Sequence, residues 1–300
     1  MNRPTARRIR VAAALVLAIA ATTLAACGST SPAATPAHTA RFDQKLHNLL
    51  PESVRSTGVL RVGTDASYAP MSAFGPDGRT IVGMEPDLGV QIGRIPGVRL
   101  QFRNDDFATL LGRVTSGDLD LAISAITDTT ERAKSVDFVN YFRAGTSIVV
   151  QHGNPAGITE LDDLCGKVVA VEIATTQVDL LARTQKNCGV QRIIVRTRPT
   201  NSDALLELRT GRAVAVPIDT PTATFLVNDS RTSSQYQLAS TAQYEPAPYG
   251  IAVAKSQPGL RDAVKGALDQ LLRSGVYADV LARWHVQTGA VQQITVNSNR

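Results

Sequence analysis

Between residues 58 and 143 the chain alternates short apolar runs with segments whose apolar residues recur at helical spacing. Residues 59–63 and 100–103 have the composition of strands. In residues 107–116 the apolar side chains fall at positions 107, 110, 111 and 114, which form one face of a helix. A further helix is predicted over residues 87–93. Strands that alternate with helices are typical of largely parallel sheets, so the pattern predicts an α/β fold.

The same alternation restarts after residue 161 and returns near the C-terminus. The predicted elements are strands over 167–171, 192–195, 213–218 and 250–254, and helices over 176–184, 203–209, 260–273 and 277–284. Two extended segments, 143–150 and 243–249, separate these blocks, and Pro246 and Pro248 stiffen the second one. We therefore expect two α/β lobes joined by two crossings, with a ligand cleft between them at the carboxyl ends of strands.

Residues 123–132, ISAITDTTER, place hydroxyl groups and an arginine directly after a predicted strand over residues 118–123. Thr127, Asp128 and Thr129 are residue types that cap a helix start, where free backbone N–H groups and the helix dipole favour an anion. Arg132, one turn further on, has the planar fork that grips a carboxylate. From this segment alone two interpretations stay open: a carboxylate socket, or an ordinary capped helix with a surface arginine.

The N-terminal residues have the layout of a secretory signal peptide. Four arginines precede an apolar run over residues 11–21, which is shorter than the roughly 20 residues that a membrane-spanning helix needs. The following Leu-Ala-Ala-Cys resembles the lipobox of bacterial lipoproteins, which predicts a leader over residues 1–26 and a lipid on Cys27. The alternative is a plain secreted protein with a chance cysteine. Residues 27–57 are expected to hold the anchor, a flexible tether and a short N-terminal segment.

Removal of this leader changes the charge of the chain. The full sequence has a formal charge of +5, and residues 1–26 hold four arginines and no acid, so +1 remains. The basic composition therefore does not indicate a nucleic-acid partner. In an exported chain we expect Cys165 and Cys188 to form a disulfide rather than remain buried thiols. No metal site is expected, because the four histidines are scattered without ligand spacing.

Several motifs, taken in order over residues 57–286, resemble the extracellular solute-binding proteins of family 3. They are GVLRVGTDASYAP at 58–70, GMEPDLG at 83–89, DLDLAISAITDTTERA at 118–133, VDFVNYF at 136–142, LCGKVVAVEIATTQ at 164–177, a strand ending at Asp219, YEPAPYGIAVAK at 244–255 and SGVYADVLARW at 274–284. The cysteine pair looks like that of high-GC Gram-positive members.

The resemblance implies a two-lobed, type II periplasmic-binding-protein-like fold with two crossover hinge segments. The first lobe is expected over residues 58–143 and 246–287, the second over 144–245 with a hinge crossing at each end, and a tail over 288–300. The implied function is capture of a free amino acid between the lobes and its delivery to the permease subunits of an ABC importer.

The resemblance also implies how the amino-acid backbone is held. Arg132 corresponds to the family's arginine that grips the ligand α-carboxylate, and Thr127 to a residue whose backbone N–H binds the same group. Thr175 and Thr176 correspond to residues at a helix start that complete this carboxylate site, and Asp219 to the acid that pairs with the ligand α-ammonium. A free amino acid is a zwitterion, so a desolvated cleft has to supply both kinds of partner.

Other positions are implied to face the ligand side chain. Tyr68 and Phe107 correspond to residues that stack on or wall it, although ordinary packing explains aromatics nearly as well. Asp65, close to the expected pocket mouth, either selects a cationic side chain or is simply an acid frequent in the family. Ala125 stands where many members have serine or glycine, which removes a hydroxyl contact to the ammonium and puts more weight on Asp219.

Three further positions bear on the pocket. Ala174 replaces the usual glycine before the two threonines and constrains that turn, and Met71 stands where an aromatic often follows the proline. Glu85 is expected to be structural, near the cap of the helix over 87–93.

We expect a binding protein and not an enzyme, with no cofactor, lipid-anchored to the outer face of the cell membrane and monomeric. One alternative is a binding or sensory lipoprotein for a compatible solute or polyamine, which predicts loss of the Arg132 and Asp219 pair. Another is a dehydratase-like enzyme on the same scaffold, which needs a general acid or base in the cleft.

Overall fold

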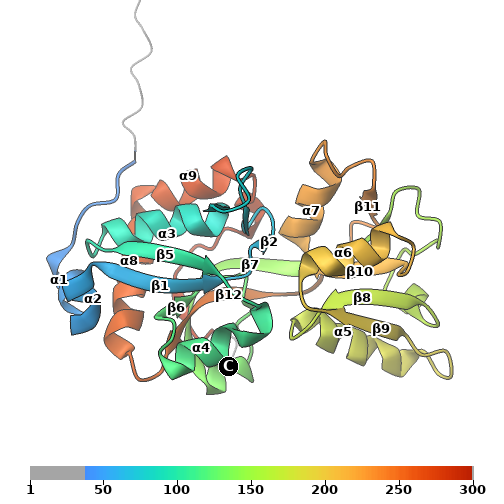
Figure 1. Ribbon diagram of the computed structural model, residues 1–300, viewed down its shortest axis with the longest axis horizontal. Helices are drawn as coiled ribbons and strands as arrows, with labels where there is room; N and C mark the ends of the chain where they lie inside the picture. Colours follow the sequence, from blue (N-terminus) through green and yellow to red (C-terminus); the bar gives the residue numbers. More distant parts are fainter. Residues whose placement is uncertain (1–37, 299–300) are drawn as a thin grey trace, which may run out of the picture. The chain divides into compact units, whose positions relative to one another are not determined.

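The structure is a computed structural model that describes residues 38–298, so the predicted leader and Cys27 lie outside the described residues. The described chain has the expected two-lobed α/β fold (Figure 1). In this part of the chain, no helix combines the length and apolarity that a membrane crossing needs.

One ten-stranded sheet and one small three-stranded sheet account for the strands of the described chain. The strands are β1 (Val59–Thr64), β2 (Ser67–Tyr68), β3 (Ser72–Phe74), β4 (Ile81–Val82), β5 (Arg99–Asn104), β6 (Leu121–Ala122), β7 (Val136–Gln151), β8 (Val168–Glu172), β9 (Ile194–Arg198), β10 (Ala215–Asp219), β11 (Tyr236–Leu238), β12 (Tyr244–Ala254) and β13 (Thr295–Val296). The large sheet has the order β5-β1-β6-β12-β7-β10-β8-β9, and β11 and β13 also pair with β7.

Helices cover this sheet in both lobes (Figure 1). They are α1 (Gln44–Asn48), α2 (Glu52–Thr57), α3 (Met84–Arg94), α4 (Leu110–Ser116), α5 (Thr176–Thr184), α6 (Asn201–Arg209), α7 (Thr220–Asn228), α8 (Pro258–Ser274) and α9 (Val276–Arg283), with 3₁₀ turns η1 (Phe107–Thr109), η2 (Arg132–Lys134), η3 (Asp162–Leu164), η4 (Gln185–Asn187) and η5 (Gln287–Gly289). We call the half built on β1, β5 and β6 lobe 1, and the half built on β8, β9 and β10 lobe 2.

Each lobe has a parallel core sheet of its own. In lobe 1, β1 pairs in parallel with β5 and β6; in lobe 2, β8 pairs in parallel with β9 and β10. Apolar side chains of these strands pack under the helices, for example Leu60 and Val62 with Leu88 of α3 in lobe 1, and Ala170 with Leu208 of α6 in lobe 2. Parallel strands end at the same edge, so each lobe presents its strand ends together.

Two long antiparallel strands link the lobes. β7 pairs with β12 at its lobe 1 end and with β10 and β11 at its lobe 2 end. The segments expected as joints, 143–150 and 243–249, lie within or against these strands. The β7–β12 register shifts between Tyr244 and Ala247, where Pro246 cannot donate a backbone hydrogen bond.

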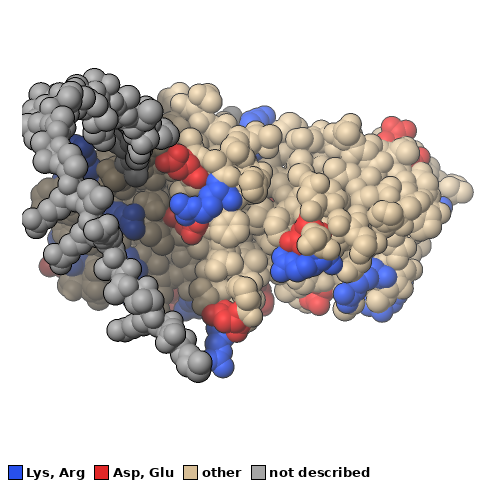
Figure 2. All heavy atoms as spheres, turned by 90° about the horizontal axis from the view of Figure 1, so that it is seen from above, with Lys and Arg blue, Asp and Glu red and all other residues tan. Residues whose placement is uncertain are grey.

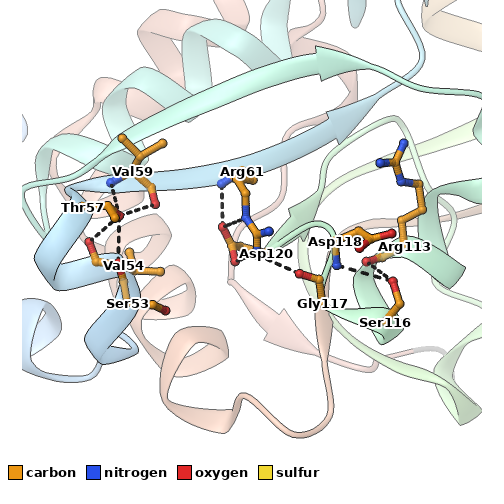
Figure 3. A network of polar contacts seen from close by, with 10 residues as sticks. All are labelled: Ser53, Val54, Thr57, Val59, Arg61, Arg113, Ser116, Gly117, Asp118 and Asp120. Carbon is orange, nitrogen blue, oxygen red and sulfur yellow. Dashed lines mark hydrogen bonds and ion pairs between the residues drawn. The ribbon is translucent and has the colours of Figure 1, made fainter.

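A polar network in lobe 1 fixes the loop that leads into β6 (Figure 3). Asp120 accepts the Arg61 backbone N–H at 2.7 Å and its guanidinium at 2.7 and 3.1 Å, and the same guanidinium reaches the Gly117 carbonyl at 2.8 Å. Of the strand predicted over 118–123, only Leu121 and Ala122 form a strand, and they pair with β1. Residues 124–132 therefore start from a fixed point.

One local prediction is wrong. No helix starts at Thr127; residues 123–131 are loop with an isolated bridge from Thr127 to Tyr249, and Arg132 begins only the short turn η2. Backbone pairing with the neighbouring strand takes up this segment, because Asp128 N–H donates to the Pro248 carbonyl at 2.9 Å. The helix-dipole argument therefore does not apply at Thr127.

The disulfide is present. Cys165 and Cys188 are bonded, with their Cα atoms 5.3 Å apart and a sequence separation of 23. The bond ties the start of β8 to the end of the α5–η4 segment in lobe 2.

Candidate functional site

The strand ends of both lobes converge on one pocket, whose empty space is about 320 Å³ with open solvent included. All nine residues that the sequence predicted to contact a ligand line it, and three others join them. The full lining is Asp65, Tyr68, Phe107, Ser124, Ala125, Thr127, Arg132, Glu172, Thr175, Thr176, Gln177 and Asp219. The first seven come from lobe 1 and the last five from lobe 2.

Arg132 reaches across the cavity from lobe 1. Its Nη1 donates to the Thr127 carbonyl at 2.9 Å and its Nη2 to the Ala174 carbonyl of lobe 2 at 2.8 Å. The guanidinium carbon lies 5.5 Å from the centre of the Phe107 ring, within range of a cation–π contact. Burial lowers the pKa of the guanidinium, and the negative charges of Asp219 and Asp179 raise it. The arginine remains charged and is oriented by both lobes.

The helix start that faces the cavity belongs to α5 in lobe 2. Thr175 is its N-cap residue, with extended backbone, and its hydroxyl donates to the Glu172 carbonyl at 2.8 Å instead of capping the helix. The backbone N–H groups of Thr176 and Gln177, which begin this nine-residue helix, are thus available to an anion, whereas the Val178 N–H donates to the Thr175 carbonyl. The preceding residue, Ala174, has φ of 64°, a left-handed conformation that favours glycine. The sequence analysis expected a constrained turn here, because alanine replaces the usual glycine.

Asp219 ends β10 and is 8% exposed. Its Oδ1 accepts the Gln177 side-chain amide at 2.7 Å, and its backbone N–H donates to the Tyr68 hydroxyl at 3.0 Å, a contact between the lobes. Burial raises the pKa of its carboxyl to about 6, whereas hydrogen bonds from neighbouring side chains and the charge of Arg132 lower it. A buried acid in this state is stabilised in its ionised form by a cation that enters the cavity.

Ala125 lies on a tight turn supported from below by Glu85. Ala125 has φ of 47°, and its N–H donates to Glu85 Oε1 at 2.6 Å. Glu85 is fully buried in α3, and it also accepts hydrogen bonds from the Ser72 and Tyr141 hydroxyls. Burial raises the pKa of Glu85. Glu85 is outside the cavity lining and supports its floor, which agrees with a structural role, although it lies inside the helix rather than at its cap.

Sequence reasoning missed Ser124, Glu172 and Gln177. Ser124 lines the cavity, but its Oγ already accepts a hydrogen bond from the Asp65 N–H at 2.9 Å. Glu172 carried a signal: it is an acid at the end of the otherwise apolar run VVAVE, and it is 4% exposed. An acid that terminates a buried strand is expected to face either a partner or a pocket.

Within residues 38–298 no group of three or more His, Cys, Asp or Glu side chains could hold a metal ion. On the face shown in Figure 2, acidic and basic side chains lie in small mixed groups on a mostly uncharged surface.

Comparison with known proteins identifies relatives along nearly the whole described chain. Residues 60–287 match the family model for bacterial extracellular solute-binding proteins, family 3. The arginine-binding protein ArgT of Corynebacterium glutamicum is 26% identical over 84% of this chain and 83% of its own length. The L-cystine-binding protein TcyJ of Escherichia coli K12 is 29% identical over 77% of this chain and 84% of its own.

Solved structures share the fold. A mutant of ArgBP from T. maritima is 33% identical, with a TM-score of 0.71 over 78% of this chain and 98% of that one. An ancestral amino acid-binding protein described as a precursor of cyclohexadienyl dehydratase is 29% identical, with a TM-score of 0.69 over 79% of this chain and 99% of that one.

Proposed function

The chain belongs to family 3 of the bacterial extracellular solute-binding proteins, and from that membership we propose that it captures a free amino acid between its lobes and delivers it to the permease of an ABC importer. Relatives named for binding arginine, cystine and glutamine support an amino acid as the ligand class.

The observation that carries the proposal is the placement of Arg132 and Asp219 in one buried cavity, from opposite lobes. Arg132 binds the ligand α-carboxylate in a two-toothed grip, together with the Thr127 N–H and the α5 start at Thr175 and Thr176. Asp219 binds the α-ammonium. Because a zwitterion satisfies both buried charges at once, a ligand that lacks either group leaves one of them unpaired, which is costly in a buried site.

Capture follows from the two-lobed construction. The proposed lobes, residues 58–143 with 246–287 and residues 144–245, are joined through β7 and β12, and both contribute to the cavity. A ligand that contacts both lobes favours the closed form over the open one, and closure is the signal that a permease can read. Tyr68 and Phe107 of lobe 1 then wall the ligand side chain.

The cellular setting is part of the proposal. The family is extracellular, which supports export by a leader over residues 1–26. Lipid attachment at Cys27 and the tether that follows would hold a monomer near the permease at the outer face of the membrane.

The rival functions differ from the proposal either in which ligand binds or in whether the bound ligand reacts. A compatible solute or a polyamine lacks the pairing of α-carboxylate and α-ammonium that Arg132 and Asp219 match. A dehydratase needs a proton donor, and the resemblance to the dehydratase precursor makes this worth testing. Recovery of the bound ligand unchanged after long incubation separates binding from turnover.

A thermal-shift screen of the exported protein against the common amino acids, compatible solutes and polyamines tests the proposal, because a ligand that binds only the folded state raises Tm. We expect the strongest shifts from amino acids, and their loss in Arg132→Ala and Asp219→Asn. Arg231→Ala is the matched control, since that side chain is 78% exposed and pairs with Asp229 away from the cavity. Strong hits without a carboxylate, or hits that survive Arg132→Ala, would overturn the proposal.

A further inference from the structure

Two acids that the backbone site does not use face the same cavity from opposite lobes. Asp65 directly follows β1 of lobe 1, and Glu172 is the last residue of β8 of lobe 2. Both line the cavity, and each is 4% exposed. Carboxyl groups this deeply buried are rare unless they have a partner.

Each acid keeps one oxygen without an N–H or hydroxyl donor from a neighbouring residue. Asp65 Oδ1 accepts the Ser67 N–H at 2.7 Å, but Asp65 Oδ2 and Glu172 Oε1 are buried and receive no hydrogen bond from an N–H or hydroxyl group of the described residues. Leaving a buried acceptor unsatisfied costs about 1–3 kcal/mol, and more when it is charged. Apart from each other, Asp65 Oδ2 and Glu172 Oε1 therefore have no partner until a donor enters the cavity.

The charged residues around the cavity indicate the charge of the group that should donate to these acids. Its lining contains three carboxyls, Asp65, Glu172 and Asp219, and one cation, Arg132; Tyr68 is the remaining titratable group. The α-carboxylate and α-ammonium of an amino acid use Arg132 and Asp219. Two carboxyls are left over for the ligand side chain, and a positive side chain is their complement.

The leftover pair holds a proton while no cation is bound. Burial raises the pKa of Glu172 to about 10, and the hydrogen bond with Asp65 and the negative charges of Asp65 and Asp219 raise it too. At neutral pH Glu172 is therefore protonated and shares that proton with Asp65. A neighbouring cation reverses the balance, because it stabilises the carboxylate form.

We propose that Asp65 and Glu172 form a side-chain subsite for the guanidinium or ammonium group of a basic amino acid, and that the pair releases one proton to solvent as this group enters. The inference rests on the proposed function and narrows its ligand to basic amino acids. The ligand keeps its own charge, and the carboxylic acid becomes a carboxylate, so the only product besides the complex is the released proton.

Arginine and citrulline provide the matched ligand pair for the test, because citrulline has the same shape with a neutral urea in place of the guanidinium. Titration calorimetry of the exported protein at pH 6.5–8, in buffers of low and high ionisation enthalpy, counts the protons released. We expect arginine to bind at least about tenfold more tightly than citrulline and to release close to one proton more.

The pH dependence has a definite sign. Since free Glu172 holds its proton up to about pH 10 and the bound cation lowers that pKa, the complex carries fewer protons than its components across pH 6.5–8. Arginine affinity should therefore rise with pH, by up to roughly tenfold per unit, relative to citrulline. Any titration of Asp219 acts on both ligands and cancels in the ratio.

Glu172→Gln keeps the shape and removes the titrating group. We expect it to lower the affinity ratio of arginine to citrulline by about 10- to 100-fold and to abolish the extra proton. Asp65→Asn should lower the same ratio and provides a second variant should Glu172→Gln fold poorly. Glu160→Gln, an exposed acid of lobe 2 away from the cavity, is the matched control and should change neither quantity.

The outcomes separate the two proposals. Equal affinity for arginine and citrulline in the wild type, or an unchanged ratio in both variants, overturns the subsite. Tight binding of a neutral amino acid without binding of arginine or lysine also overturns it, and leaves the proposed function intact. Failure of every amino acid to bind overturns the proposed function itself.

Discussion

Replacing Arg132 by lysine is the sharpest test of the carboxylate grip, because the charge stays and the fork is lost. In the structure Nη1 and Nη2 hold carbonyl oxygens of Thr127 and Ala174 at 2.9 and 2.8 Å, one in each lobe. A lysine ammonium at this place is a point donor, and it cannot span both carbonyls while it also binds a carboxylate through two parallel hydrogen bonds.

The expected loss can be worked from the bonds that disappear. A hydrogen bond to a charged group contributes about 1.5–3 kcal/mol, and lysine forgoes at least one of the two bonds to the ligand carboxylate. Part of the Thr127 and Ala174 contact is lost as well, so we expect about 2–3 kcal/mol in binding free energy. This corresponds to a roughly 30- to 150-fold weaker Kd.

The assay compares the tightest amino acid of the screen with the amine that remains after its carboxylate is removed. In the wild type the amino acid should bind far more tightly than the amine. In Arg132→Lys this difference should shrink by the 30- to 150-fold estimated above, since any effect on lobe closure weakens both ligands alike and cancels in the ratio. An equal loss for both ligands would refute the reasoning, because the substitution would then act on the protein rather than on the carboxylate.

Further predictions concern pH, stability and anchoring. Because ionised Asp219 is the form that holds an ammonium and its pKa is about 6, affinity for a neutral amino acid should be constant above that pH and fall as pH decreases below it; calorimetry at pH 5 and 7.5 measures the difference, which Asp219→Asn should remove. Reduction of the Cys165–Cys188 bond should lower the free energy of unfolding by about 3 kcal/mol, seen as a lower Tm with a reductant that leaves a double serine variant unaffected. Ala174→Gly should raise the stability of the unliganded protein by about 0.5–1 kcal/mol in urea unfolding, since φ is 64° there, and no gain would mean that the turn is unstrained. Replacement of Cys27 by serine should move the protein from the membrane fraction to the medium, and mass spectrometry of the native N-terminus should find lipid on the sulfur.

Elements that depend on local periodicity could be predicted from the sequence. The strand expected over 59–63 is Val59–Thr64, and the helix expected over 176–184 has the same bounds in the structure. Short elements with few residues could not be predicted in this way. The small β2–β3–β4 sheet consists of two- and three-residue strands, and its pairing depends on neighbours that periodicity does not describe.

Two of the failures at the site have a common cause. Thr127 has the residue type of a helix cap, yet its segment pairs with the neighbouring strand near Tyr249 and Pro248, which is more than a hundred residues away in sequence. Glu172 was passed over because its role depends on Asp65, which lies in the other lobe. Residue types and local spacing indicate candidates, but the partner that decides each role comes from a distant segment.

The same residues that would hold the ligand also hold the lobes together, which makes binding and closure one equilibrium. Arg132 bonds to Ala174, the Asp219 N–H bonds to the Tyr68 hydroxyl, and each bond joins lobe 1 to lobe 2. A substitution at Arg132 or Tyr68 therefore changes the population of the closed form before any ligand arrives, and the apparent Kd changes with that population. Glu172 also meets Asp65 across the lobes, but the amide of Glu172→Gln can still donate to Asp65, so this substitution should alter selectivity with the least change in closure. Small-angle scattering of the unliganded variants distinguishes the two effects: Tyr68→Phe should shift the average toward a more open form, whereas Glu172→Gln should leave the radius of gyration at the wild-type value.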